Sequence, residues 1–116
     1  MSLKPHAVTF DTSDPEKLAE FWGAALGLQV NPPQFSGFAT IGTMGSFPFY
    51  VFQKLDDLNE GLNRFHIDFA AGKDLDAETE RLVELGATVV AKVAENGIRF
   101  NTLTDPDGNK FDVTNE

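Results

Sequence analysis

The segment AALGLQV (residues 24–30) is matched by VELGATV (residues 83–89) in the second half of the chain. Each copy leads from an amphipathic helix pattern, through one glycine, into a short strand pattern. The same offset of 59 residues aligns further pairs of segments, namely AVTF (7–10) with HIDF (66–69), and FQ (52–53) with FD (111–112). Internal similarity at a fixed offset is typical of repeated structural modules. Two copies predict a pseudo-twofold domain with a shared concave site.

Each module is predicted to carry one helix between strands. Asp14 and Pro15 are typical of a helix start, and Gly27 is typical of a helix end. The second helix is expected to have acidic residues in its first turn, around Asp74, and to stop at Gly86. The expected strands cover residues 6–12, 29–30, 37–42, 47–54, 64–70, 87–93, 98–104 and 110–114. The order is βαβββ twice, an α+β fold in one domain spanning residues 1–116, with module 1 at about 6–54, a linker at about 55–63 and module 2 at about 64–116.

Composition and charge narrow the function classes. The chain has 116 residues, 41% of them hydrophobic, and no Cys, which excludes disulfides and thiolate chemistry. Nine basic and 18 acidic residues give a net charge of −9. Such a surface repels phosphate backbones, so a nucleic-acid partner is not expected. No apolar run approaches the ~20 residues of a membrane span. The sequence predicts a cytoplasmic protein that does not contact membranes.

Four segments carry a resemblance to a known family. They are DTSDPEKLAEFW (11–22), NRFHIDF (63–69), LVELGA (82–87) and DPDGNKF (105–111). In order and spacing they resemble the vicinal oxygen chelate superfamily, and within it the small glyoxalase-like proteins, whose relatives include bleomycin resistance proteins and dioxygenases. The resemblance implies two βαβββ modules in one cupped, eight-stranded mixed sheet with helices on the convex face. It also implies a homodimer and, where a divalent ion is bound, ligands from the first and last strands of each module.

Strand alternation tests which ligands the second module could supply. Ile67 and Phe69 form an apolar face, which leaves His66 facing the cup. Phe111 and Val113 do the same in the last strand and leave Asp112 facing the cup. His66 and Asp112 match the positions of the family's second-module ligands, although the family usually has Glu where this chain has Asp.

The first module matches the ligand pattern less well. An offset of 60 would align His6 with His66, whereas the offset of 59 puts Ala7 at the ligand position and turns His6 away from the cup. The offset of 59 keeps the apolar faces on the helix side, so His6 is disfavoured as a ligand. The fourth position falls on Gln53, a weaker neutral ligand. The expected metal set is therefore His66, Asp112 and Gln53, a degraded site, because divalent sites normally use three or four good protein ligands.

Other side chains are candidates for ligand binding. Phe49 and Val51 share strand parity with Gln53, and all three are expected to line the substrate site together with Asp68. Arg64 and Arg99 are candidates for holding a carboxylate, although surface ion pairs are the commoner role for such residues.

Three functions remain open at this point. The first is a protein that binds a small molecule in the cup, with a degraded or absent metal site. The second is a lyase or isomerase of the glyoxalase type that uses one divalent ion. The third is a metal-free catalyst in which His66 acts as the acid or base. Neither the substrate nor the need for a metal follows from the sequence.

Overall fold

The computed structural model describes residues 6–33, 36–55 and 66–116. Arg64 and all of the expected linker except Leu55 lie outside the described residues. The chain divides into two compact units, residues 1–59 (unit 1) and residues 60–116 (unit 2). Each unit is described by itself below. Neither described helix has the length and apolar character needed to cross a membrane.

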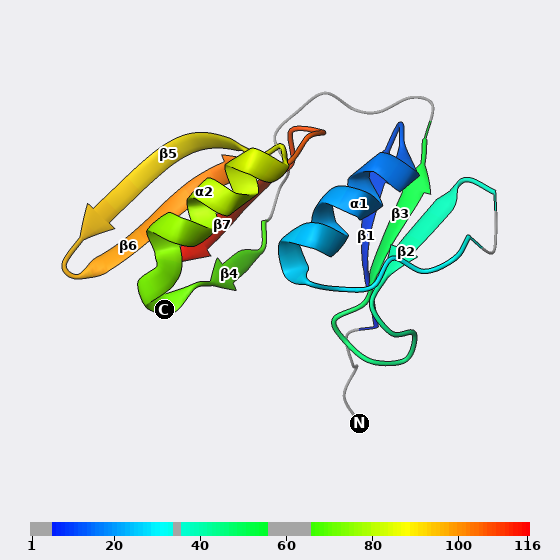
Figure 1. The fold of residues 1–116 in the computed structure, drawn as a ribbon, viewed down its shortest axis with the longest axis horizontal. Coiled ribbons are helices and arrows are strands. Elements are labelled where there is room, and N and C mark those ends of the chain that lie inside the picture. Colours follow the sequence, from blue (N-terminus) through cyan, green and yellow to red (C-terminus); the bar gives the residue numbers. More distant parts are fainter. Residues whose placement is uncertain (1–5, 34–35, 56–65) are drawn as a thin grey trace. The chain divides into compact units, whose positions relative to one another are not determined.

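Unit 1 consists of one helix on a three-stranded mixed sheet (Figure 1). Its elements are β1 (Val8–Thr12), α1 (Pro15–Leu26), β2 (Phe38–Ile41) and β3 (Tyr50–Lys54). The strand order is β1-β3-β2, with β1 parallel and β2 antiparallel to β3. The strand expected at 29–30 is represented by an isolated bridge between Val30 and Ile41.

The ends of α1 confirm the capping signals in the sequence. The side chain of Asp14 accepts a hydrogen bond from the Lys17 N–H at 3.2 Å, and Pro15 occupies the first helical turn. Gly27 closes the helix in the left-handed conformation, with φ of 67°, which costs glycine less than any other residue. The helix packs on all three strands, and its Trp22 is buried against Phe10 of β1.

Unit 2 has one helix on a four-stranded mixed sheet (Figure 1). Its elements are β4 (Asp68–Ala70), a 3-10 turn η1 (Gly72–Asp74), α2 (Leu75–Leu85), β5 (Thr88–Glu95), β6 (Ile98–Thr104) and β7 (Lys110–Thr114). The strand order is β4-β7-β6-β5, and only the β4–β7 pair is parallel. This unit has the predicted βαβββ order. The described residues thus form two mixed sheets of three and four strands.

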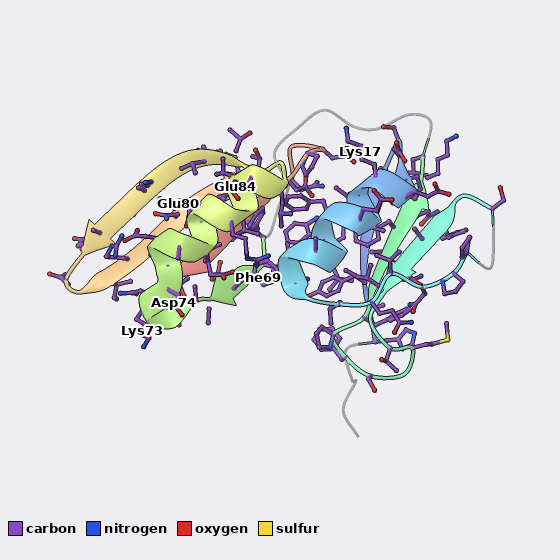
Figure 2. All side chains as sticks on the ribbon, in the orientation of Figure 1. Lys17, Phe69, Lys73, Asp74, Glu80 and Glu84 are labelled. Carbon is purple, nitrogen blue, oxygen red and sulfur yellow. The ribbon has the colours of Figure 1, made fainter. Side chains whose placement is uncertain are left out.

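The helix α2 has one buried face and one acidic face. Its buried residues are Leu75, Thr79 and Leu82. Asn101 of β6 donates a buried hydrogen bond to the Thr79 hydroxyl at 2.9 Å, which ties the helix to the sheet. Glu80 and Glu84 lie one turn apart on the exposed face (Figure 2). The core of unit 2 therefore lies between α2 and one face of the sheet, and the face away from α2 is called the open face below.

Candidate functional site

Three chemically active side chains converge at one place in unit 2. His66 Nε2 lies 3.2 Å from Asp68 Oδ1 and 3.2 Å from Asp112 Oδ2. Ligand atoms of the three residues all lie within 4.8 Å of one another. The Asp112 side chain is only 15% exposed, whereas His66 and Asp68 are about half exposed or more. The cluster is accessible from solvent and has Asp112 at its base.

The backbone explains why these residues meet. Phe111 and Val113 are buried in the core, so strand alternation turns Asp112 to the open face. Asp68 is the parallel-strand partner of Asp112. The Asp112 N–H donates to the Ile67 carbonyl at 3.0 Å, which holds the residue next to His66 against β7. The sequence pattern had predicted this common face for His66 and Asp112.

A fourth residue, Thr102 of β6, lies next to this cluster. Thr102 is the antiparallel partner of Asp112. Its hydroxyl donates to Asp112 Oδ1 at 2.6 Å. This contact occupies one carboxylate oxygen and leaves Oδ2 for His66. Asp68, Asp112 and Thr102 therefore lie side by side across β4, β7 and β6.

The spacing of the cluster suits a divalent ion. Two ligand atoms that each lie about 2.1 Å from one ion, at a right or tetrahedral angle, are about 3.0 to 3.4 Å apart. The two contacts of His66 Nε2, both 3.2 Å, fall in this range. One imidazole and two carboxylates are also ligands that Mn²⁺, Fe²⁺ and Zn²⁺ accept. The donor types and the two distances from His66 Nε2 are therefore compatible with a metal ion.

The remaining predicted site residues belong to the open face of unit 1. Gln53 alternates with the fully buried Phe52, so it is turned away from α1 and is half-buried. Phe49 and Val51 line a pocket of about 530 Å³ on this unit. His6, expected to point away from the concave face, lines the same pocket. The metal-ligand roles of Gln53 and His6 stay predictions.

Arg99, a candidate for holding a carboxylate, forms an ion pair within unit 2. Its guanidinium donates to Asp76 of α2 at 2.7 Å, an exposed ion pair between β6 and the helix. This is the commoner of the two roles considered for it.

Comparison with known proteins identifies the family of this chain. A family model described as a glyoxalase-like domain matches residues 7–114. The chain belongs to this family. Glyoxalase-like domains are part of the vicinal oxygen chelate superfamily, which agrees with the resemblance carried by the four sequence segments. Among curated proteins, none matches the sequence significantly.

Solved structures of glyoxalase-like proteins share the fold. A glyoxalase/bleomycin resistance protein/dioxygenase family enzyme from Burkholderia phytofirmans PsJN has a TM-score of 0.78 at 18% identity, covering 94% of this chain and 95% of that one. A glutamate-to-glutamine variant of the fosfomycin resistance protein FosX from Listeria monocytogenes, complexed with Mn(II) and 1S,2S-dihydroxypropylphosphonic acid, has a TM-score of 0.80 at 18% identity, covering 99% and 91%. Oxidase ChaP-H2 has a TM-score of 0.68 at 19% identity, covering 100% and 95%. At these identities the likeness concerns the fold.

The sequence pattern indicates Asp68 as a substrate-binding residue or a charge partner of His66, and the structure has it within ion-pair distance of His66. Its substrate-binding role stays a prediction. Thr102 belongs to none of the motifs considered in the sequence. Its contact with Asp112 depends on the pairing of β6 with β7. The turn at 105–109 predicts that hairpin, so counting outward from the turn could have found Thr102.

Proposed function

We propose that this chain binds a small, oxygen-bearing molecule beside one divalent ion held by His66, Asp112 and Asp68. The convergence of His66 Nε2 with two carboxylate oxygens at 3.2 Å carries the proposal. Membership of the glyoxalase-like family supports it. When bound, such an ion acts as a Lewis acid that polarises substrate oxygens. The chemistry that it would serve is that of a glyoxalase-type lyase or isomerase.

The proposal extends to the whole fold. We infer that the two sheets, with the segment around Val30, make one cupped, eight-stranded mixed sheet. In that arrangement Gln53 of unit 1 is the further protein ligand. The sequence indicates a degraded site with two good ligands, and we propose Asp68 as a third because it lies beside His66 within unit 2.

Titration calorimetry of EDTA-treated protein with Mn²⁺ and with Zn²⁺ tests the metal site. We expect about one ion per chain, no binding by His66→Ala, and at least tenfold weaker binding by Asp112→Asn, which keeps an acceptor for Thr102. Glu84→Gln, an exposed acidic residue of α2, is the matched control and should bind as the wild type does. Ion binding that survives His66→Ala would overturn the proposal. If His6→Ala abolishes ion binding, the further protein ligand is His6 and not Gln53.

A second candidate is metal-free catalysis by His66. The same two carboxylate contacts favour it, because carboxylates beside an imidazole fix its orientation. This function predicts turnover that persists in EDTA and disappears in His66→Ala. Turnover that requires added metal would contradict it.

A further inference from the structure

The pocket on unit 1 has the dimensions of a small-molecule site. Its volume of about 530 Å³ lies within the range of about 300 to 1,000 Å³ that is usual for such sites. Its walls come from β2, β3, the segment after α1 and the turn after β2. Four of the apolar residues that line it are Phe38, Met44, Phe49 and Val51. The exposed fractions of Phe38 and Met44 are 41% and 67%, so the pocket presents apolar surface that a ligand could cover.

The charges around the pocket restrict the class of ligand. The described lining residues include one His, His6, and no Lys, Arg, Asp or Glu. The chain as a whole carries a net charge of −9, which disfavours anions in the surrounding field. A cation that entered the pocket would lose hydration without gaining a carboxylate of the described lining in return. The field thus acts against anions and the lack of a carboxylate acts against cations, so we expect an uncharged ligand.

Hydrogen bonds make one side of the pocket rigid and leave the Thr40 hydroxyl as a donor for a ligand. The Asn31 amide donates to Thr40 Oγ1 at 3.0 Å and to the Gly42 carbonyl at 2.9 Å, which ties the segment after α1 to β2. Both amide protons are then used. The Thr40 oxygen accepts, so its own hydroxyl proton can be donated to an acceptor in the pocket.

We propose that this pocket binds an uncharged aromatic molecule whose ring packs on Phe38 and Met44 and whose oxygen accepts from the Thr40 hydroxyl. Aromatic rings and thioether sulfur both favour contact with another aromatic ring. The inference rests on the proposed function for the role of the ligand, but the binding step itself needs no metal ion.

Three fluorescent probes of the same ring size test the ligand class on the full chain in EDTA. They are neutral 2-naphthol, anionic 2-naphthoate and cationic 2-naphthyltrimethylammonium. We expect 2-naphthol to bind at least tenfold more tightly than either ion, with amide chemical shifts changing in β2 and β3. Equal or tighter binding of a charged probe, or shifts confined to unit 2, would overturn the proposal, as would the absence of saturable binding.

Two variants locate the contacts. Phe38→Ala should weaken 2-naphthol binding at least fivefold, whereas Ile98→Ala, a matched exposed apolar residue of unit 2, should not change it. Thr40→Val should weaken binding of 2-naphthol but not of naphthalene, which has no acceptor oxygen. If Phe38→Ala and Ile98→Ala behave alike, the site is elsewhere. Because EDTA is present throughout, this result is independent of whether the ion site proposed for His66 exists.

Discussion

The Thr102 hydroxyl decides how Asp112 presents its carboxylate. Its short contact with Oδ1, at 2.6 Å, turns Oδ2 toward His66. Residues that hydrogen-bond a metal ligand fix its orientation, and their loss typically weakens metal binding about 10- to 100-fold. Thr102 is therefore a positioning residue for the proposed ion.

Replacing Thr102 by Val should lower the affinity for Mn²⁺ by about 10- to 100-fold. Val keeps the shape of Thr and removes the hydroxyl, so the Asp112 carboxylate becomes free to rotate. Thr102→Ser should restore most of the affinity. Thr104→Val, two residues along β6, is the control and should bind like the wild type. Calorimetric titration measures all three. If Thr102→Ser binds as weakly as Thr102→Val, orientation through the hydroxyl is the wrong explanation.

Tyr50 gives unit 1 a pH-dependent stability. The side chain begins β3, is 6% exposed and lies near the Phe10 ring. Burial raises the pKa of its phenol above the ordinary value of 10.0, because the charged phenolate loses hydration in the core. The folded state therefore holds this proton more tightly than the unfolded state does. Stability from this group is present below pH 10 and is lost as the pH rises through the folded pKa.

Tyr50 is the single Tyr of the chain, so absorbance at 295 nm should follow its ionisation alone. We expect a midpoint above 10 in native protein and near 10 in denaturant. The free energy of unfolding should fall above pH 10 in the wild type and fall less in Tyr50→Phe. Identical midpoints in native and denatured protein would show that burial does not perturb this phenol.

At the scale of elements, the sequence predicted most boundaries where strong local signals exist. Asp14, Pro15 and Gly27 predicted α1, and β6 and β7 have the predicted bounds, because the turn at 105–109 fixes their ends. The Asp105 carboxylate accepts from the N–H groups of Asp107 and Asn109, which closes that turn. The expected strand at 29–30 is reduced to a bridge at Val30 because two residues before a Pro-Pro pair cannot sustain a ladder.

Strand faces were predicted better than strand pairing. Alternation alone put His66 and Asp112 on one face, since each strand must turn its apolar residues to the helix. Pairing depends on contacts between distant segments and is not periodic. The offset of 59 aligns Thr9 with Asp68. Thr9 pairs with Val51, whereas Asp68 pairs with Asp112, which lies two residues beyond the position that the offset assigns to Val51. The parallel strand pairs of the two units therefore differ in register by two residues. The proximity of Asp68 to Asp112 follows from this register, which the sequence pattern did not contain, whereas the pairing of Thr102 with Asp112 follows from the β6–β7 hairpin.

At the scale of the whole molecule, the single Trp and three of the proposed metal ligands lie in different units. Trp22, the single Trp of the chain, lies on the buried face of α1 in unit 1. His66, Asp68 and Asp112 belong to unit 2. Trp22 fluorescence therefore reports the unfolding of unit 1, whereas far-ultraviolet circular dichroism reports both units. Together these signals can test whether the proposed ion also involves Gln53.

An ion at 100 times its dissociation constant stabilises the protein that binds it by about 2.7 kcal/mol. If Gln53 is a ligand, Mn²⁺ should move both the Trp22 and the circular dichroism transitions to higher urea concentrations. Gln53→Ala should abolish the shift seen by Trp22 and keep a smaller shift in the circular dichroism, because three ligands remain in unit 2. Gln29→Ala, the matched amide in the same unit, should behave like the wild type. The contrary outcome is that Mn²⁺ shifts the circular dichroism transition of the wild type and leaves its Trp22 transition in place. In that case the ion is held by unit 2 alone, and a shared ligand set no longer supports the proposed eight-stranded cup.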